Sequence, residues 1–218
     1  MIKSLIMSDK SRILPQSFFM NEDILEVARA LLGKILVTEF NGITTSGIIV
    51  ETEAYRGLDD RASHAYPMKK TERTKTMFLD GGHCYIYLCY GLHHLFNVVA
   101  GKEGTPNAVL IRAIEPVLGF EEMMLRRNHT KFSPRLSSGP ACVSQALGID
   151  KNWNGHNLTL GESIWVENSC SENNLIKIGA STRIGVDYAG EDAKLPWRFF
   201  ERENPWVSAY PKAEFITL

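Results

Sequence analysis

The chain has 218 residues, of which 44% are hydrophobic and 22% are charged. This mixture is typical of soluble globular proteins and excludes disordered, collagen-like and coiled-coil chains. The apolar runs are far shorter than the ~20 residues needed to span a bilayer. Residues 1–7 are too short a leader for a signal peptide. We therefore expect an intracellular protein that binds no membrane.

The formal net charge of −1 argues against a strongly basic nucleic-acid-binding protein, but the charges are unevenly distributed. Residues 61–75 contain five basic residues and one acid, and residues 126–135 contain four basic residues and no acid. Such an asymmetric surface can hold a polyanion on one face, although two solvated loops explain the pattern equally well. The four cysteines form no C-x-x-C pair, so we expect buried reduced thiols.

The N-terminal part predicts a loose tail, one helix and two strands, over residues 1–16, 22–32, 34–40 and 43–55. Asn21 is the expected N-cap of the helix, and Gly33 ends it. Asn41-Gly42 is the strongest hairpin-turn signal in the chain, so the two strands should pair directly.

After a polar loop over residues 56–76, the chain predicts mainly short strands. The expected strands cover residues 83–89, 96–100, 108–114, 164–167, 175–178 and 197–200, and the expected helices cover 119–127 and 138–147. Tyr90-Gly91 separates the first two strands, and Glu115-Pro116 ends the third. Because there is no linker or repeat, we expect one α+β domain with a curved, mostly antiparallel sheet, flanking helices and a protruding β-hairpin.

Glu53 is the first candidate for a catalytic residue. Side chains alternate along a strand, so Glu51, Glu53 and Tyr55 share one face of the strand over residues 43–55. A carboxylate among aromatic rings is partly desolvated, which raises its pKa and its strength as a base. An edge-strand glutamate in solvent is the simpler interpretation, and the local pattern favours it.

Aromatic residues form the second candidate group. His64 lies in the polar loop, where a histidine is more often structural than catalytic. Tyr85 and Tyr87 share a strand face, and such rings are usually part of the core. Tyr90 precedes Gly91 at the hairpin tip, where little protein can bury its ring. A ring in that place can act as a wedge between base pairs or as a stacking platform.

The combined pattern resembles the alkyladenine (3-methyladenine) DNA glycosylase family over about residues 18 to 208. The most specific blocks are IVETEAY at 49–55, DDRASH at 59–64, YIYLCYG at 85–91 and VLIRAIEP at 109–116. The resemblance implies a single domain over residues 1–218. It also implies a monofunctional repair enzyme that acts on double-stranded DNA as a monomer, without a metal or other cofactor. Such enzymes flip out 3-methyladenine, 7-methylguanine, hypoxanthine or ethenoadenine and hydrolyse the N-glycosidic bond, leaving an abasic site.

The resemblance also assigns roles to single residues. Glu53 matches the glutamate that activates the attacking water, and Arg112 matches the arginine that holds the glutamate and the water. Tyr90 matches the ring that wedges into the duplex. The flipped base would be sandwiched by Tyr55, His64 and Tyr87, with Asn97 in the pocket wall, and the DNA backbone contacted by Lys69, Thr71, Arg73 and Met77. One departure is Ala141-Cys142, where some relatives carry a lysine.

Two other functions remain open from the sequence. The first is a lesion-binding module without turnover, which would not need the pair of Glu53 and Arg112. The second is a metal-dependent hydrolase built on Glu53 with His64, His83 and His93. Adjacent histidines such as His93-His94 point to opposite faces of a strand, so they chelate one ion poorly.

Overall fold

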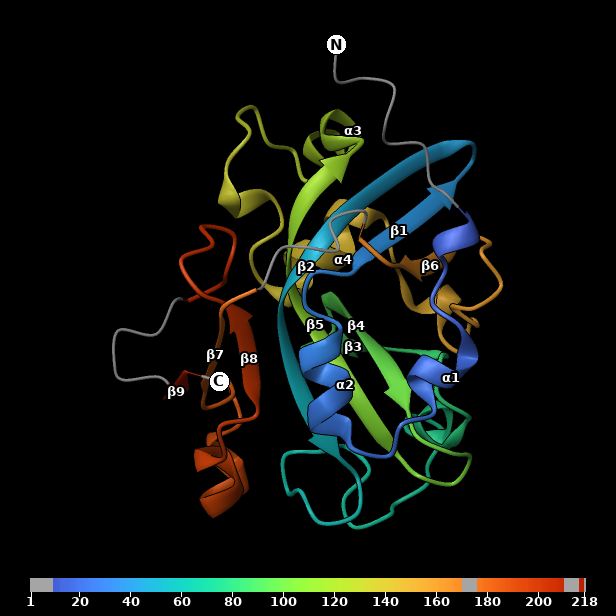
Figure 1. The fold of residues 1–218 in the computed structure, drawn as a ribbon, viewed down its shortest axis with the longest axis vertical. Coiled ribbons are helices and arrows are strands. Elements are labelled where there is room, and N and C mark those ends of the chain that lie inside the picture. The colour runs from blue at the N-terminus through green and yellow to red at the C-terminus, as the bar shows by residue number, and fades with distance from the viewer. Residues whose placement is uncertain (1–9, 170–175, 210–215, 218) are drawn as a thin grey trace.

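A long antiparallel pair of strands, β2 (Ile43–Arg56) and β5 (Asn107–Leu118), runs through the middle of the protein (Figure 1). The structure is a computed structural model, and it describes residues 10–169, 176–209 and 216–217. Over these residues a nine-stranded sheet has the order β3-β4-β5-β2-β8-β7-β9, with β1 and β6 branching from β2. Every strand pair is antiparallel, and the further strands are β1 (Ile35–Phe40), β3 (Cys84–Cys89), β4 (His93–Ala100), β6 (Ile164–Glu167), β7 (Ile178–Ser181), β8 (Arg198–Glu201) and β9 (Ile216–Thr217).

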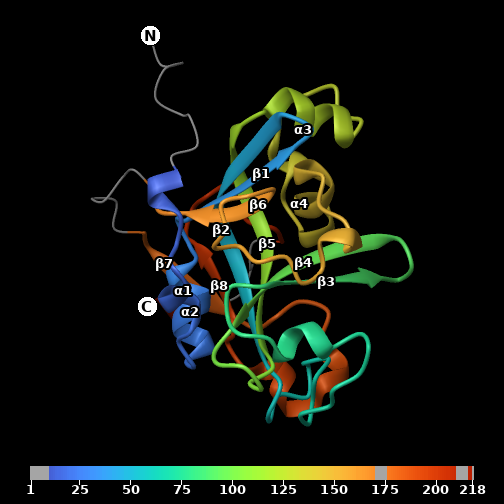
Figure 2. The same cartoon turned by 90° about the vertical axis from the view of Figure 1, so that its right-hand side faces the viewer.

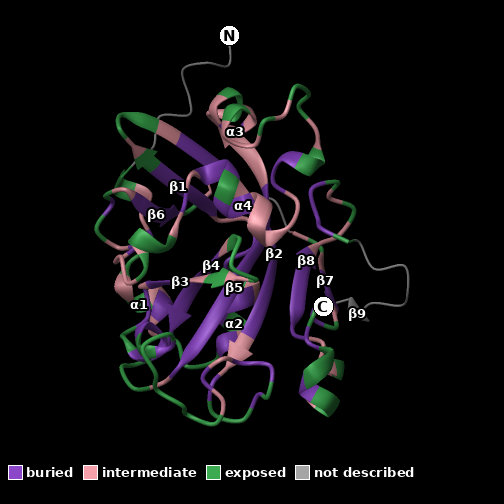
Figure 3. Cartoon of the chain, turned by 180° about the vertical axis from the view of Figure 1, so that it is seen from behind, coloured by how far each residue is buried: buried purple, intermediate pink, exposed green. Residues whose placement is uncertain are grey.

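Helices cover both faces of this sheet. Figure 2 shows α2 (Ile24–Ala30) and α4 (Pro140–Leu147) on opposite sides of it. Most strand residues between them are buried, whereas the loops are largely exposed (Figure 3). The remaining helical segments are α1 (Gln16–Phe19), α3 (Phe120–Arg126), and the 3-10 turns η1 (Lys10–Arg12), η2 (Lys75–Phe78), η3 (Pro134–Leu136), η4 (Lys151–Trp153) and η5 (Asp187–Lys194). The expected α+β class is confirmed, as is the hairpin of β3 and β4 that protrudes from the body (Figure 2).

Strand β2 changes partner halfway along its length. Its first half pairs with β1 up to Ile48, and its second half pairs with β8 over residues 51–53. At the change, the ladder between β2 and β5 shifts register on both sides of Glu51. Such irregularities bend a strand and increase its twist. The sheet therefore divides at Glu51, and β2 is a central strand over the stretch that carries Glu53.

Several expected boundaries were wrong. The N-cap of α2 is Asp23 rather than Asn21, because the Asp23 carboxylate accepts the N–H groups of Leu25 and Glu26 at 2.9 and 3.2 Å. β5 continues through Pro116, which lies beside a register shift where the missing N–H is tolerated.

Other strands begin elsewhere than expected. β4 starts at His93 instead of residue 96. The antiparallel pairing of β3 with β4 continues to the end of the hairpin, where Cys89 lies opposite His93. β7 covers residues 178–181 instead of 175–178, and residue 175 lies outside the described residues.

The structure describes residues 10–16 of the expected loose tail. Leu14 is 2% exposed, and its N–H donates to the Val166 carbonyl at 2.8 Å. Ile13 forms an isolated antiparallel bridge with Glu167. These residues therefore pack along β6 instead of extending into solvent.

A buried ion pair fixes the loop that follows β2. Arg183 donates from both terminal nitrogens to Asp60, at 2.5 and 2.8 Å, and neither side chain is exposed. Arg183 also donates to the Ala54 carbonyl at 2.9 Å, and Asp60 accepts the Ala62 N–H at 3.0 Å. The pair thus ties the end of β2 to the segment before η5, and it sets where the next residues, including His64, can lie.

Neighbouring aspartates allow a matched test of this ion pair. We expect Asp60→Ala to lower the free energy of unfolding by about 3–5 kcal/mol, because Arg183 keeps a buried charge without its partner. Asp59 pairs with Arg56 at the surface, with side chains 54% and 40% exposed. Asp59→Ala should therefore cost less than about 1 kcal/mol. Urea unfolding followed by circular dichroism measures both, and equal losses would contradict the assignment.

Candidate active site

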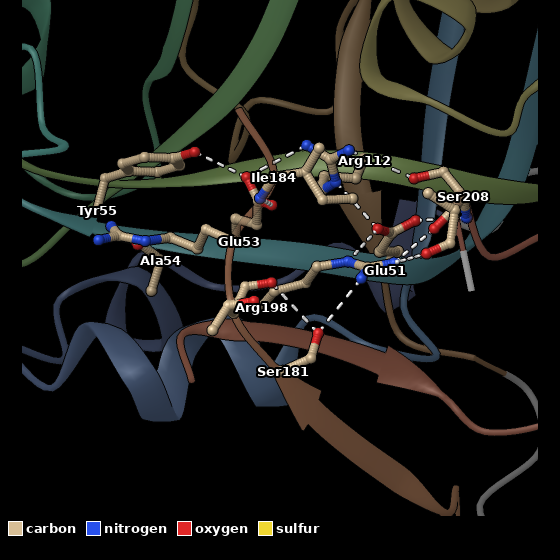
Figure 4. A network of polar contacts seen from close by, with 12 residues as sticks. Glu51, Glu53, Ala54, Tyr55, Arg112, Ser181, Ile184, Arg198 and Ser208 are labelled. Atoms are coloured by element: carbon tan, nitrogen blue, oxygen red, sulfur yellow. Dashed lines mark hydrogen bonds and ion pairs between the residues drawn. The ribbon is translucent and has the colours of Figure 1, made fainter. Parts of the chain in front are cut away.

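Glu53 is a buried carboxylate with three hydrogen-bond donors. Its side chain is fully buried, and it accepts from the Tyr55 hydroxyl at 2.7 Å, Arg112 Nη1 at 3.2 Å and the Ile184 N–H at 2.8 Å (Figure 4). The simpler expectation of an edge glutamate in solvent was wrong, because β2 lies between β5 and β8 at this point. A buried carboxylate costs free energy unless it is paired and hydrogen-bonded, and these donors meet that requirement.

Arg112 is held from two sides. Its Nη1 faces Glu53, and its Nε donates to Glu51 Oε1 at 2.9 Å. Burial alone would lower the pKa of the Arg112 guanidinium, but the charges of Glu53 and Glu51 raise it above its ordinary value. The guanidinium therefore stays charged and keeps one orientation beside Glu53.

Glu51 completes the network and was not expected to have a role. It accepts from Arg198 Nε at 2.6 Å and from the Ser208 N–H at 2.6 Å, in addition to Arg112 (Figure 4). The two carboxylates and two arginines thus balance their charges inside the protein. The alternation of side chains along the strand had placed Glu51 on the same face as Glu53. Nothing else in the sequence indicated that Glu51 belongs to the network.

A cavity of about 260 Å³ adjoins the network. The three residues that donate to Glu53, namely Tyr55, Arg112 and Ile184, all line it. The volume lies just below the range of about 300–1,000 Å³ of drug-sized ligand sites, so the cavity suits a small ligand. The structure also brings the other expected pocket residues, His64, Tyr87 and Asn97, to its lining. Met77 and Tyr90 line it too, although they were expected to contact the DNA backbone and to wedge into the duplex.

Aromatic rings form much of the cavity wall. The His64 and Tyr87 rings meet edge to face with centroids 4.5 Å apart, and Tyr85 stacks beside Tyr87 at 5.5 Å. Burial raises the pKa of Tyr85 to about 12 and that of Tyr87 further, so both phenols are neutral at neutral pH. Burial, followed by the charge of Glu53, also raises the pKa of Tyr55. The wall therefore offers uncharged π faces.

Asn97 has a fixed position in this wall. Its side-chain amide donates to the backbone carbonyls of Tyr85 at 3.0 Å and Leu95 at 3.3 Å, and only 3% of the residue is exposed. Tyr188 lines the cavity as well and was missed, although the family resemblance extends past it to about residue 208. Its hydroxyl donates to the Ala62 carbonyl at 3.0 Å, which joins η5 to the loop of His64.

Tyr90 lies in the turn between β3 and β4 and is 92% exposed. Figure 2 shows that the hairpin of these two strands protrudes from the body. Tyr90 and Gly91 both have positive φ angles, of 51° and 72°, and the Leu92 N–H donates to the Cys89 carbonyl at 3.1 Å. Two positive φ angles in succession are typical of the tight turns that match strand twist. A left-handed conformation is uncommon for tyrosine, and here it directs a large ring to the tip.

The residues expected to contact the DNA backbone lie in different environments. Lys69 is exposed, and the Thr71 hydroxyl lies 3.0 Å from that of Thr74 within a local turn. Met77 is 1% exposed and faces the cavity, so its side chain is not available at the surface. The Arg73 guanidinium lies 5.1 Å from the centroid of the Tyr87 ring.

The metal-hydrolase alternative has no ligand set in the part of the chain that the structure describes. No three His, Cys, Asp or Glu side chains lie together there as a metal ion would require. Among the same residues, no helix is both long and apolar enough to cross a membrane. Cys84 is buried as expected, but Cys89 and Cys142 are only partly buried, and Cys170 lies outside the described residues.

Comparison with known proteins agrees with the resemblance. The model of the methylpurine-DNA glycosylase (MPG) family matches residues 18–205. A protein of Chlamydia felis is 49% identical over 189 residues, which cover 86% of this chain and 95% of that protein. Proteins of Clostridium perfringens and Bacillus cereus are 45% and 46% identical and cover 87% and 89% of this chain, and 96% and 98% of their own lengths. All three carry the name "Putative 3-methyladenine DNA glycosylase". With a family match over most of its length, the chain belongs to the methylpurine-DNA glycosylase family, and the expected DNA glycosylase is confirmed at this level.

Proposed function

We propose that the protein flips a damaged purine out of double-stranded DNA into the aromatic cavity and hydrolyses its N-glycosidic bond with a water activated by Glu53. The observation that best supports this is the placement of a buried, arginine-paired carboxylate directly behind a small aromatic cavity. No lysine is among the residues that line the cavity, which favours a monofunctional enzyme over a Schiff-base lyase. We further propose that it acts as a monomer on DNA inside the cell, without a metal or cofactor.

Glu53 would serve the hydrolysis in two ways. As the N-glycosidic bond breaks, the base leaves with the bonding electrons, and the sugar develops positive charge that the carboxylate stabilises. Water then forms the new bond to the sugar carbon and gives a proton to Glu53. Arg112 and the Ile184 N–H hold the carboxylate in place. A module that only bound lesions would gain nothing from this costly buried pair.

The walls fit the chemistry of alkylated bases. 3-Methyladenine and 7-methylguanine carry a positive charge, and a cation over an aromatic face gains roughly 0.5–2 kcal/mol. The same charge makes the base a good leaving group. Hypoxanthine and ethenoadenine are neutral and leave more easily when protonated. Burial, and then the charge of Arg73, lower the pKa of His64 to about 4, so His64 is not the acid for that step at neutral pH.

Removal of the Glu53 charge tests the proposed chemistry. We expect Glu53→Gln to slow release of 7-methylguanine and hypoxanthine from duplex DNA by about 10²–10⁴-fold, because the general base is lost. Alkali-sensitive strand breaks under single-turnover conditions measure the rate. EDTA should leave the wild-type rate unchanged. Loss of activity in EDTA, or full activity of the variant, would refute the mechanism, whereas retained lesion binding by the variant shows that it is folded.

The hairpin tip provides a second test. Base flipping costs a few kcal/mol, and a ring that fills the vacated space offsets part of this cost. We expect Tyr90→Ala to weaken lesion-duplex binding by about tenfold to a hundredfold, since base–aromatic stacking contributes about 1–3 kcal/mol. Tyr90→Phe keeps the ring and should bind like the wild type. Equal binding by all three proteins in fluorescence anisotropy would exclude the wedge.

A further inference from the structure

We propose that Tyr188 is a further base-binding residue, whose ring lies at the mouth of the cavity and retains the flipped purine after it has entered. This inference rests on the proposed function and deepens it, because it gives a second exposed tyrosine a role in the same site. The two tyrosines then have separate tasks. Tyr90 fills the space that the base leaves in the duplex, whereas Tyr188 contacts the base itself.

Exposed residues of the cavity wall mark its mouth. Among the described residues that line the cavity, the exposed ones are Tyr90, Ile184, Gly185 and Tyr188. Tyr188 is 69% exposed, which by itself is ordinary for a tyrosine on a protein surface. Its ring also lines a concave site of about 260 Å³, however, so a ligand that enters the site can cover it.

The turn that carries Tyr188 is buried at both ends. The Ala189 N–H donates to the Val186 carbonyl at 2.8 Å, so Tyr188 occupies a central position of a tight turn within η5 and the residue before it. Val186 and Ala189 are 3% and 1% exposed and form a cluster with Ala62, and Tyr55 packs against this cluster. The buried ends therefore place the exposed Tyr188 ring beside the part of the wall that Tyr55 supplies.

The hydroxyl group keeps the Tyr188 ring in this place. It donates to the Ala62 carbonyl at 3.0 Å, two positions before His64 in the loop that supplies another part of the wall. Burial, and next the charge of Asp60, raise the pKa of Tyr188, so the phenol stays a neutral donor at neutral pH. A ring tied to the cavity loop stays with the protein instead of entering the duplex. Its fixed orientation also lowers the ordering cost when a base arrives.

This position determines how Tyr188 would act on a flipped base. A base that stacks on Tyr55 has the Tyr188 ring at its outer edge, because the turn of Tyr188 begins and ends in the residues on which Tyr55 packs. Their contact removes apolar surface of the base and of the ring from water, which stabilises the flipped state. After hydrolysis the abasic sugar has no base, so this contact no longer holds the DNA.

The test distinguishes the two tyrosines by the DNA that they bind. Fluorescence anisotropy gives the Kd for a duplex with hypoxanthine and for the same duplex with a stable abasic-site analogue. The Glu53→Gln background slows release of the base. We expect Tyr188→Ala to weaken binding of the hypoxanthine duplex by about fivefold or more, and to leave binding of the abasic duplex unchanged. Tyr90→Ala should weaken both, because its ring fills the gap with or without a base.

Two control variants separate the ring from its surroundings. Tyr188→Phe keeps the ring and loses only the hydrogen bond to Ala62, so it should bind the hypoxanthine duplex more tightly than Tyr188→Ala. Leu125→Ala removes a side chain that is 75% exposed on α3 and does not line the cavity, so it should change neither affinity.

The outcomes that contradict the inference differ from those that contradict the proposed function. Equal weakening of both duplexes by Tyr188→Ala would overturn the inference and leave Tyr188 as a contact to the DNA backbone. Unchanged binding of both duplexes, or a loss in Tyr188→Phe as large as in Tyr188→Ala, would overturn it as well. A wild-type protein that releases no damaged base from any duplex would instead overturn the proposed function.

Discussion

A carboxylate without solvent contact in the middle of a β-sheet is the constraint on which the rest of this structure depends. The effective cost of burying one ion is several kcal/mol, so Glu53 can lie there only if the fold supplies donors from several directions. Arg112 comes from β5, the Ile184 N–H from the segment before η5, and the Tyr55 hydroxyl from β2 itself. Glu51 does not line the cavity, and its buried carboxylate is stabilised in the same way, because it accepts a hydrogen bond from Arg198.

The polar network around Glu53 and the wall of the cavity differ in charge. Ionised groups gather at one end, where a positive sugar and an attacking water would be stabilised. Neutral rings gather at the other end, where a planar base would lie. Because arginines lie behind both aromatic walls, the rings are also held in place from the outside. The cavity thereby has a fixed shape before any ligand arrives, which reduces the ordering cost of binding.

The sequence predicted local structure well and long-range structure poorly. Alternation along one strand placed Glu53 and Tyr55 on one face, and the Tyr90-Gly91 turn was recognised from its residues alone. The burial of Glu53 could not be predicted, because it depends on β8, whose Phe200 pairs with Glu51 from far along the chain. The contact between Arg73 and His64 was equally hidden, since a spacing of nine residues in an irregular loop sets no geometry. The family resemblance supplied the grouping of residues that physical patterns could not.

The partners of Glu51 have a consequence for how the protein is made. Arg198 and Ser208 lie 147 and 157 positions after Glu51 in the chain, so a ribosome exposes them long after β2 and β5 have emerged. Contacts of such high sequence separation form late, because their loop-closure entropy must be overcome first. A nascent chain would therefore hold β2 and β5 before it holds an ordered Arg112. Under the proposed mechanism, hydrolysis would then require that β8 and the segment around Ser208 have docked, and a partly made chain would not act on DNA.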